Sequence, residues 1–64
     1  MKSIKIYHVG NFNYEIEYHT GLKIEVHTKN VDRLKQQYET DGYKATYLEC
    51  DGEDFYQTDE IKIF

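Results

Sequence analysis

Three short runs of alternating apolar and polar residues lie within the first half of this 64-residue chain, at residues 3–9, 14–19 and 22–27. Because successive side chains of a β-strand point to opposite faces, a period of two predicts half-buried strands. The Gly-Asn-Phe sequence at residues 10–12 interrupts the alternation once, and Gly21 interrupts it again. We therefore expect three consecutive antiparallel strands that share one apolar face.

The apolar positions also predict how these strands pair, because a slip of one residue would turn the apolar side chains of one strand into water. A three-residue loop at residues 19–21, with Gly21 in the left-handed region, keeps the apolar faces together. The predicted pairs are Tyr18 with Leu22, Ile16 with Ile24 and Tyr14 with Val26. The same loop length at residues 10–12 predicts Ile6 opposite Ile16 and Ile4 opposite Tyr18.

One helix is expected after the third strand. Asn30 is its predicted N-cap, because its side-chain oxygen can accept a hydrogen bond from an amide of the first turn. Gly42 suits the left-handed position after the last turn, which places Tyr43 over Tyr38 and ends the helix near residue 41. The apolar stripe that would cover the strands consists of Val31, Leu34 and Tyr38.

The pattern after the helix leaves two alternatives. Residues 43–50 read as a strand, and Asp51-Gly52 is typical of a two-residue hairpin turn. This turn would pair Cys50 with Glu53, Leu48 with Phe55 and Tyr47 with Tyr56. Alternatively, residues 52–59 form an acidic loop, and residues 60–64 supply the return strand. Either version predicts an α+β fold over a single domain, residues 1–64. The predicted fold is a small antiparallel sheet with one helix packed on one face, in the order βββα followed by two or three strands.

Composition indicates a cytoplasmic protein. Cys50 is the only cysteine, so an internal disulfide is excluded, and the first residues lack the apolar run of a secretory signal. No run of 18 apolar residues is present, and we expect no membrane association. Tyrosine and phenylalanine make up 16% of the chain and supply much of the packing material.

Negative charge is concentrated near the C-terminal end. Six of the twelve acidic residues fall within residues 49–60, and no lysine or arginine interrupts this stretch. The net charge of −4 therefore arises from this segment, because the rest of the chain has more basic than acidic residues. Such a segment requires either water or a basic partner.

No motif predicts catalysis, a metal or a cofactor. His8, His19 and His27 have no zinc-like spacing to one another or to Cys50. The acidic stretch lacks the glycine of a calcium loop at the sixth position, and weak divalent-cation binding is an alternative. Acidic neighbours disfavour a Cys50 thiolate, so we expect no enzyme, and direct binding of nucleic acid is disfavoured by the charge.

These observations predict a non-catalytic protein that binds and inhibits a basic, nucleic-acid-handling protein by presenting carboxylates as a mimic of phosphates. The candidate partner-binding residues are Tyr47, Glu49, Asp51, Glu53, Asp54, Phe55, Tyr56, Asp59 and Glu60. In size, charge and absence of catalytic motifs, the chain is similar to compact acidic inhibitors carried by phages, including many anti-CRISPR and anti-restriction proteins. That similarity implies the host cell cytoplasm. The alternative is a homo-oligomer, such as a homodimer, that buries a sheet edge or an outer face containing Tyr7, Tyr47 and Tyr56, with the acids serving only solubility.

Overall fold

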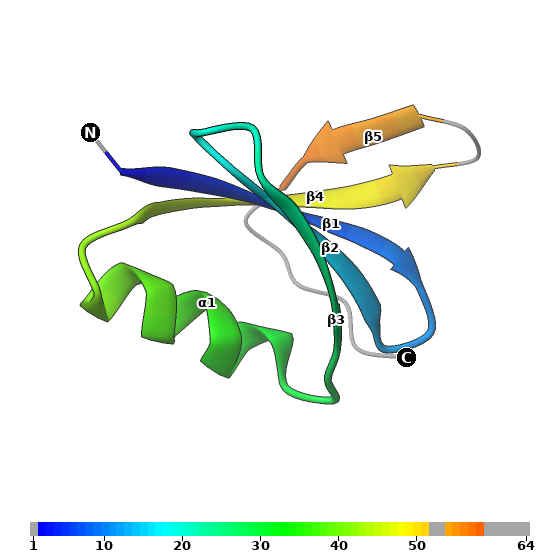
Figure 1. The fold of residues 1–64 in the computed structure, drawn as a ribbon. Helices are drawn as coiled ribbons and strands as arrows, with labels where there is room; N and C mark the ends of the chain where they lie inside the picture. Colours follow the sequence, from blue (N-terminus) through cyan, green and yellow to red (C-terminus); the bar gives the residue numbers. More distant parts are fainter. Residues whose placement is uncertain (1, 52–53, 59–64) are drawn as a thin grey trace.

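A computed structural model of the chain describes residues 2–51 and 54–58. These residues form an α+β domain with one five-stranded sheet and one helix (Figure 1). The elements are β1 (Ser3–Gly10), β2 (Asn13–Tyr18), β3 (Lys23–His27), α1 (Val31–Thr40), β4 (Lys44–Asp51) and β5 (Asp54–Gln57). In the sheet their order is β3-β2-β1-β4-β5. The return strand considered at residues 60–64 lies outside the described residues.

The first three strands pair as the alternation predicts. Ile6 lies opposite Ile16, and Ile16 lies opposite Ile24 on the other side of β2. Gly21 has a positive φ of 94°, and the Tyr18 amide donates to the Leu22 carbonyl across the loop at 2.7 Å. Both registers and the three-residue loop at residues 19–21 are therefore confirmed. The first loop differs from the prediction, because the register shifts between His8 and Gly10, and Gly10 then pairs with Asn13 and leaves residues 11–12 as the turn.

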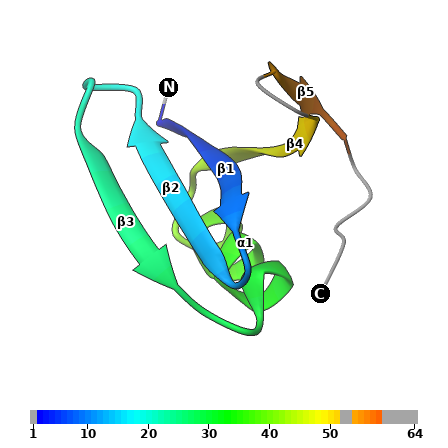
Figure 2. The ribbon, with the colours of Figure 1, turned by 90° about the vertical axis from the view of Figure 1, so that its right-hand side faces the viewer.

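The fourth strand runs parallel to β1, from the pair of Ser3 with Lys44 to the pair of Tyr7 with Leu48. The sheet is therefore mixed, which corrects the expectation of a wholly antiparallel sheet. Antiparallel neighbours can be joined by a short loop, whereas β3 and β4 are joined through α1. The helix carries the chain past β2 and β1, and the chain then returns along the free side of β1 in the same direction (Figures 1 and 2).

The C-terminal end of α1 is a Schellman motif. The Tyr43 amide donates to the Tyr38 carbonyl at 3.0 Å, and the Gly42 amide donates to the Glu39 carbonyl at 3.1 Å, with Gly42 at a φ of 94°. The rings of Tyr38 and Tyr43 meet edge to face at 5.4 Å, as predicted. The N-terminal end differs, because Asn30 occupies the N-cap position without a side-chain hydrogen bond to the helix.

The core lies between α1 and the face of the sheet that the helix covers. Its buried apolar residues are Ile4, Ile6, Tyr14, Ile16, Val31 and Tyr47. At one end of this core, the Tyr18 and Tyr38 hydroxyls are hydrogen bonded, and the Tyr43 ring packs against both rings. The opposite face of the sheet, here called the outer face, is covered by no helix or strand among the described residues (Figure 2).

The β4–β5 hairpin exists, but its register differs from the predicted one. Asp51 pairs with Asp54, Cys50 with Phe55 and Leu48 with Gln57, so the turn does not fall at Asp51-Gly52. The two registers differ by two residues, and each side chain therefore keeps the same face of the sheet. Alternation of apolar and polar residues cannot distinguish two such registers.

Candidate functional site

The acidic and aromatic residues of the hairpin form the exposed part of the predicted site. All four residues of β5 are exposed, and β5 is the last of the strands that the structure describes in the sheet. Phe55 and Tyr56 are 40% and 42% exposed, so two consecutive aromatic rings are accessible on this strand. Of the predicted site, the structure therefore brings Asp54, Phe55 and Tyr56 together on one exposed edge strand. Glu53, Asp59 and Glu60 lie outside the described residues, and Asp51 ends β4.

Phe55 is held against the outer face by a ring contact with Tyr7. The two ring centroids lie 5.1 Å apart at an interplanar angle of 83°. The Tyr7 hydroxyl donates a hydrogen bond of 3.2 Å to Glu17. Burial, followed by this bond and the neighbouring carboxylates, raises the pKa of Tyr7 above its ordinary value. Phe55 therefore belongs to a contiguous surface that extends from β5 across β4 to β1.

Tyr47 and Glu49 do not belong to that exposed surface. They are 2% and 4% exposed, and both side chains lie on the side of the sheet that faces α1. The outer face proposed for the homo-oligomer also needs correction, because Tyr7 and Tyr47 lie on opposite faces of the sheet. β-Strand alternation explains this, since Tyr47 is opposite Ile6 in the β1–β4 register and Tyr7 is opposite Leu48.

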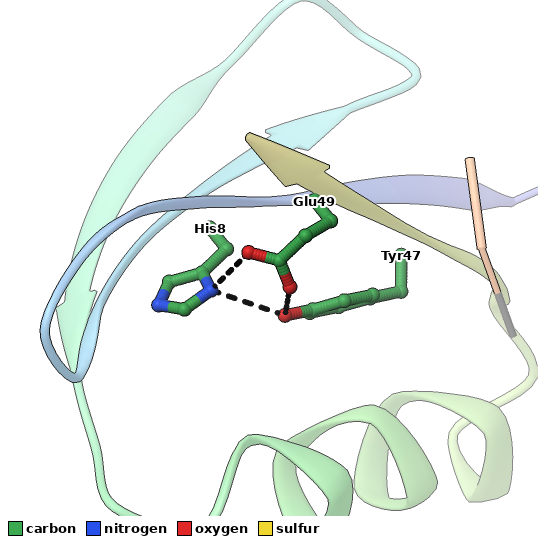
Figure 3. Close-up of polar contacts among 3 residues, drawn as sticks. All are labelled: His8, Tyr47 and Glu49. Carbon is green, nitrogen blue, oxygen red and sulfur yellow. Dashed lines mark hydrogen bonds and ion pairs between the residues drawn. The ribbon is translucent and has the colours of Figure 1, made fainter. Parts of the chain in front are cut away.

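The buried side chains of Tyr47 and Glu49 instead form a polar cluster with His8 (Figure 3). The Tyr47 hydroxyl donates to Glu49 Oε2 at 2.8 Å, and His8 Nδ1 lies 2.7 Å from Glu49 Oε1. His8 Nδ1 is also 3.3 Å from the Tyr47 hydroxyl oxygen. A protonated Nδ1 that donates to Glu49, and more weakly to the tyrosine oxygen, satisfies all three contacts at once. Both carboxylate oxygens of Glu49 then accept a hydrogen bond inside the protein.

The surroundings of this cluster are aromatic and closed to water. The His8 ring stacks on Tyr14, with centroids 4.8 Å apart and planes 21° from parallel. Burial, followed by the hydrogen bond to Glu49 and its charge, raises the pKa of Tyr47 well above its ordinary value of 10. Burial and the charge of Glu49 also raise the pKa of Tyr14. Both phenols therefore stay neutral at physiological pH, and the Tyr47 hydroxyl remains a donor to Glu49.

The cluster connects β1 to β4, since His8 comes from one strand and its two partners come from the other. Breaking a buried, hydrogen-bonded pair by removing one partner is strongly destabilising, whereas the intact pair adds specificity to a particular pairing of elements. His8 was not among the residues predicted for a site. Its position two residues after Ile6 did indicate the inward face, but its partners depend on the parallel pairing of β1 with β4.

Within residues 2–51 and 54–58, no group of three or more histidine, cysteine or acidic side chains is placed to hold a metal ion. None of the helical residues described forms a segment long and apolar enough to cross a bilayer. Comparisons with protein-family models, curated proteins and solved structures gave no significant match. The functional interpretation therefore depends on the geometry and charge of this chain.

Proposed function

We propose that this protein is a non-catalytic binding protein that occupies and inhibits a basic, nucleic-acid-handling protein in the cytoplasm. The observation that carries the proposal is the exposed β5 strand, where Phe55 and Tyr56 remain 40% and 42% accessible inside an acidic segment without lysine or arginine. Exposed aromatic rings anchor interfaces, and the electrostatic field of neighbouring charges of one sign steers an oppositely charged partner toward these rings.

The structure supports a narrower set of contact residues than the sequence pattern. The residues proposed to touch the partner are Asp51, Glu53, Asp54, Phe55, Tyr56, Asp59 and Glu60. Tyr47 and Glu49 are proposed instead to position the hairpin, because their buried bonds to His8 hold β4 against β1. Carboxylates near exposed rings resemble a row of phosphates with accessible bases, which is the chemistry that a basic groove binds.

A tagged pull-down from lysate at low salt tests this function. Salt steps and competition by DNA or RNA should release the retained protein, because the carboxylates and nucleic-acid phosphates compete for the same lysine and arginine side chains. Retention of one basic nucleic-acid enzyme with this behaviour supports the proposal, and loss of that enzyme's activity on addition of the protein supports inhibition. If only further copies of the chain are recovered and salt does not release them, the homo-oligomer hypothesis replaces the proposed inhibitor.

Charge reversal in the hairpin gives the site-specific test. We expect the double substitution Asp51→Lys with Asp54→Lys to abolish partner binding, because it inverts the local field, while the circular dichroism spectrum stays unchanged. The two aspartates face each other across β4 and β5, where like charges are destabilising, so their joint replacement does not add repulsion to the hairpin. Undiminished binding by this variant would remove the hairpin from the proposal.

A further inference from the structure

Among the strands that the structure describes, β5 is an edge strand, and it has less charged protection than the other edge. Edge strands present unpaired backbone groups, and proteins usually block them with charged side chains, particularly lysine. β3, at the other edge, carries Lys23, Glu25 and His27 within five residues. β5 carries one charge, Asp54, together with two exposed rings. We infer that β5 is a strand-addition site, at which an extended basic segment of the partner pairs antiparallel with residues 54–57.

The backbone bonds between β4 and β5 show which groups of β5 point outward. The Thr58 amide donates to the Tyr47 carbonyl at 3.1 Å, and the pairs of Glu49 with Tyr56 and Asp51 with Asp54 follow at two-residue steps. Because antiparallel residues bond alternately to either side, Tyr56 and Asp54 direct their backbone groups toward β4. The amide and carbonyl groups of Phe55 and Gln57 therefore point away from β4, toward the side of β5 on which no described strand lies.

The side chains of β5 determine the chemistry of the added strand. Phe55 lies on the outer face against Tyr7, so the residue opposite it should be apolar. Asp54 and Tyr56 lie on the other face, where an adjacent lysine or arginine can pair with the carboxylate and stack on the ring. Asp54 makes no ion pair with any described residue. The complementary segment therefore alternates basic and apolar residues.

This inference rests on the proposed function in one respect, because the basic segment is taken to belong to the basic partner. Peptide recognition by strand addition obtains affinity from main-chain hydrogen bonds and specificity from alternate side chains. Electrostatic attraction to the acidic residues would bring such a peptide to the edge, and the outward-pointing amides of Phe55 and Gln57 would fix its register. A disordered basic tail or a basic edge strand has this chemistry.

The probe is a synthetic, end-capped peptide in which lysine alternates with valine, labelled for fluorescence anisotropy and measured at low salt with the full chain. In antiparallel pairing, valines opposite Phe55 direct their own amides toward β5, whereas the lysine amides point away. N-methylation of the valines should therefore reduce binding by about tenfold or more, while N-methylation of the lysines should leave it unchanged. Both methylated peptides have the same charge and composition.

Two matched protein variants test which edge is used. Asp54→Lys should weaken peptide binding about tenfold, whereas Glu25→Lys, the same charge change on the exposed face of the opposite edge strand β3, should leave most of it. Amide hydrogen exchange adds a readout that electrostatics alone would not change. On peptide binding, the amides of Phe55 and Gln57 should become protected, while that of Tyr56, already bonded to β4, should change little.

The outcomes separate this inference from the proposed function. Equal binding of the two methylated peptides, or equal losses in Asp54→Lys and Glu25→Lys, would overturn strand addition and leave a purely electrostatic site. Protection of Phe55 and Gln57 that rises with protein concentration and needs no peptide would assign the edge to a second copy and overturn the inference. Edge-specific peptide binding without a basic enzyme in the pull-down would instead overturn the proposed function alone.

Discussion

Removal of one hydroxyl group from the buried polar cluster should destabilise the whole domain. In Tyr47→Phe, the ring keeps its packing, and the hydrogen bond of 2.8 Å to Glu49 is lost at a residue that is 2% exposed. A hydrogen bond to a charged group contributes about 1.5–3 kcal/mol, and the remaining carboxylate oxygen would be left without its donor. We therefore expect the free energy of unfolding to fall by about 2–3 kcal/mol.

This loss is large for a chain of this length. Stabilities of about 0.05–0.15 kcal/mol per residue correspond to about 3–10 kcal/mol for 64 residues, so the substitution removes about a fifth of the stability or more. The midpoint of thermal unfolding should fall by about 10 °C or more, since 1 kcal/mol shifts it by about 4–8 °C in a domain of this size. Urea unfolding followed by far-ultraviolet circular dichroism measures both the free energy and its dependence on denaturant.

The matched control is Tyr43→Phe, because the Tyr43 ring also packs against other aromatic rings, while its hydroxyl makes no hydrogen bond with a described residue. That substitution should change stability by less than about 0.5 kcal/mol. A double-mutant cycle with Glu49→Gln should then show a coupling energy of at least about 1 kcal/mol, because the two residues share one bond. Equal, small losses in Tyr47→Phe and Tyr43→Phe would refute the reasoning that the cluster stabilises the β1–β4 pairing.

Three further predictions follow from the same structure. Burial raises the pKa of the Tyr47 hydroxyl above 10, so the unfolded chain releases the hydroxyl proton at a lower pH than the folded protein does. The free energy of unfolding should therefore fall above about pH 10, by up to about 1.4 kcal/mol per pH unit for each such tyrosine. Urea midpoints across this range should show a shallower fall in Tyr47→Phe. Gly42→Ala should cost about 1 kcal/mol in urea unfolding, because the φ of 94° is unfavourable for alanine, and an unchanged midpoint would contradict the Schellman assignment. Glu25→Lys should raise stability by about 0.2–1 kcal/mol in the same assay, because Glu15 and Glu25 face each other as like charges across β2 and β3, and a loss of stability would contradict this account.

Local patterns were sufficient for the elements and for the pairings that connect neighbours in the chain. The alternation around Ile16 and the loop glycine at position 21 predicted both registers of the first three strands, because each hairpin is short and one of its faces must be buried. The same holds for the end of α1, where Gly42 and Tyr43 produce the observed cap from interactions within six residues. The β4–β5 register was missed because registers that differ by two residues have the same faces.

The exposure of the predicted site residues could be predicted in part, since some of these residues are exposed in the structure and others are buried. Phe55 and Tyr56 could be selected from composition and charge, and both rings are exposed in the structure. Tyr47 and Glu49 were selected for the same reason, yet they are buried. Their inward orientation depends on which face of β4 the helix covers, and that face is set by contacts distant in the sequence.

By itself, the sequence determined the strands, the single helix with its C-terminal cap, the first two hairpins and the concentration of negative charge, because each follows from residues close together in the chain. The tertiary structure alone decided that β4 lies parallel to β1, that β5 lies at the edge of the described sheet, and that His8 meets Glu49 41 residues away. The crossover of α1 and the burial of one sheet face select these arrangements. Both depend on packing between distant segments, for which periodicity carries no information.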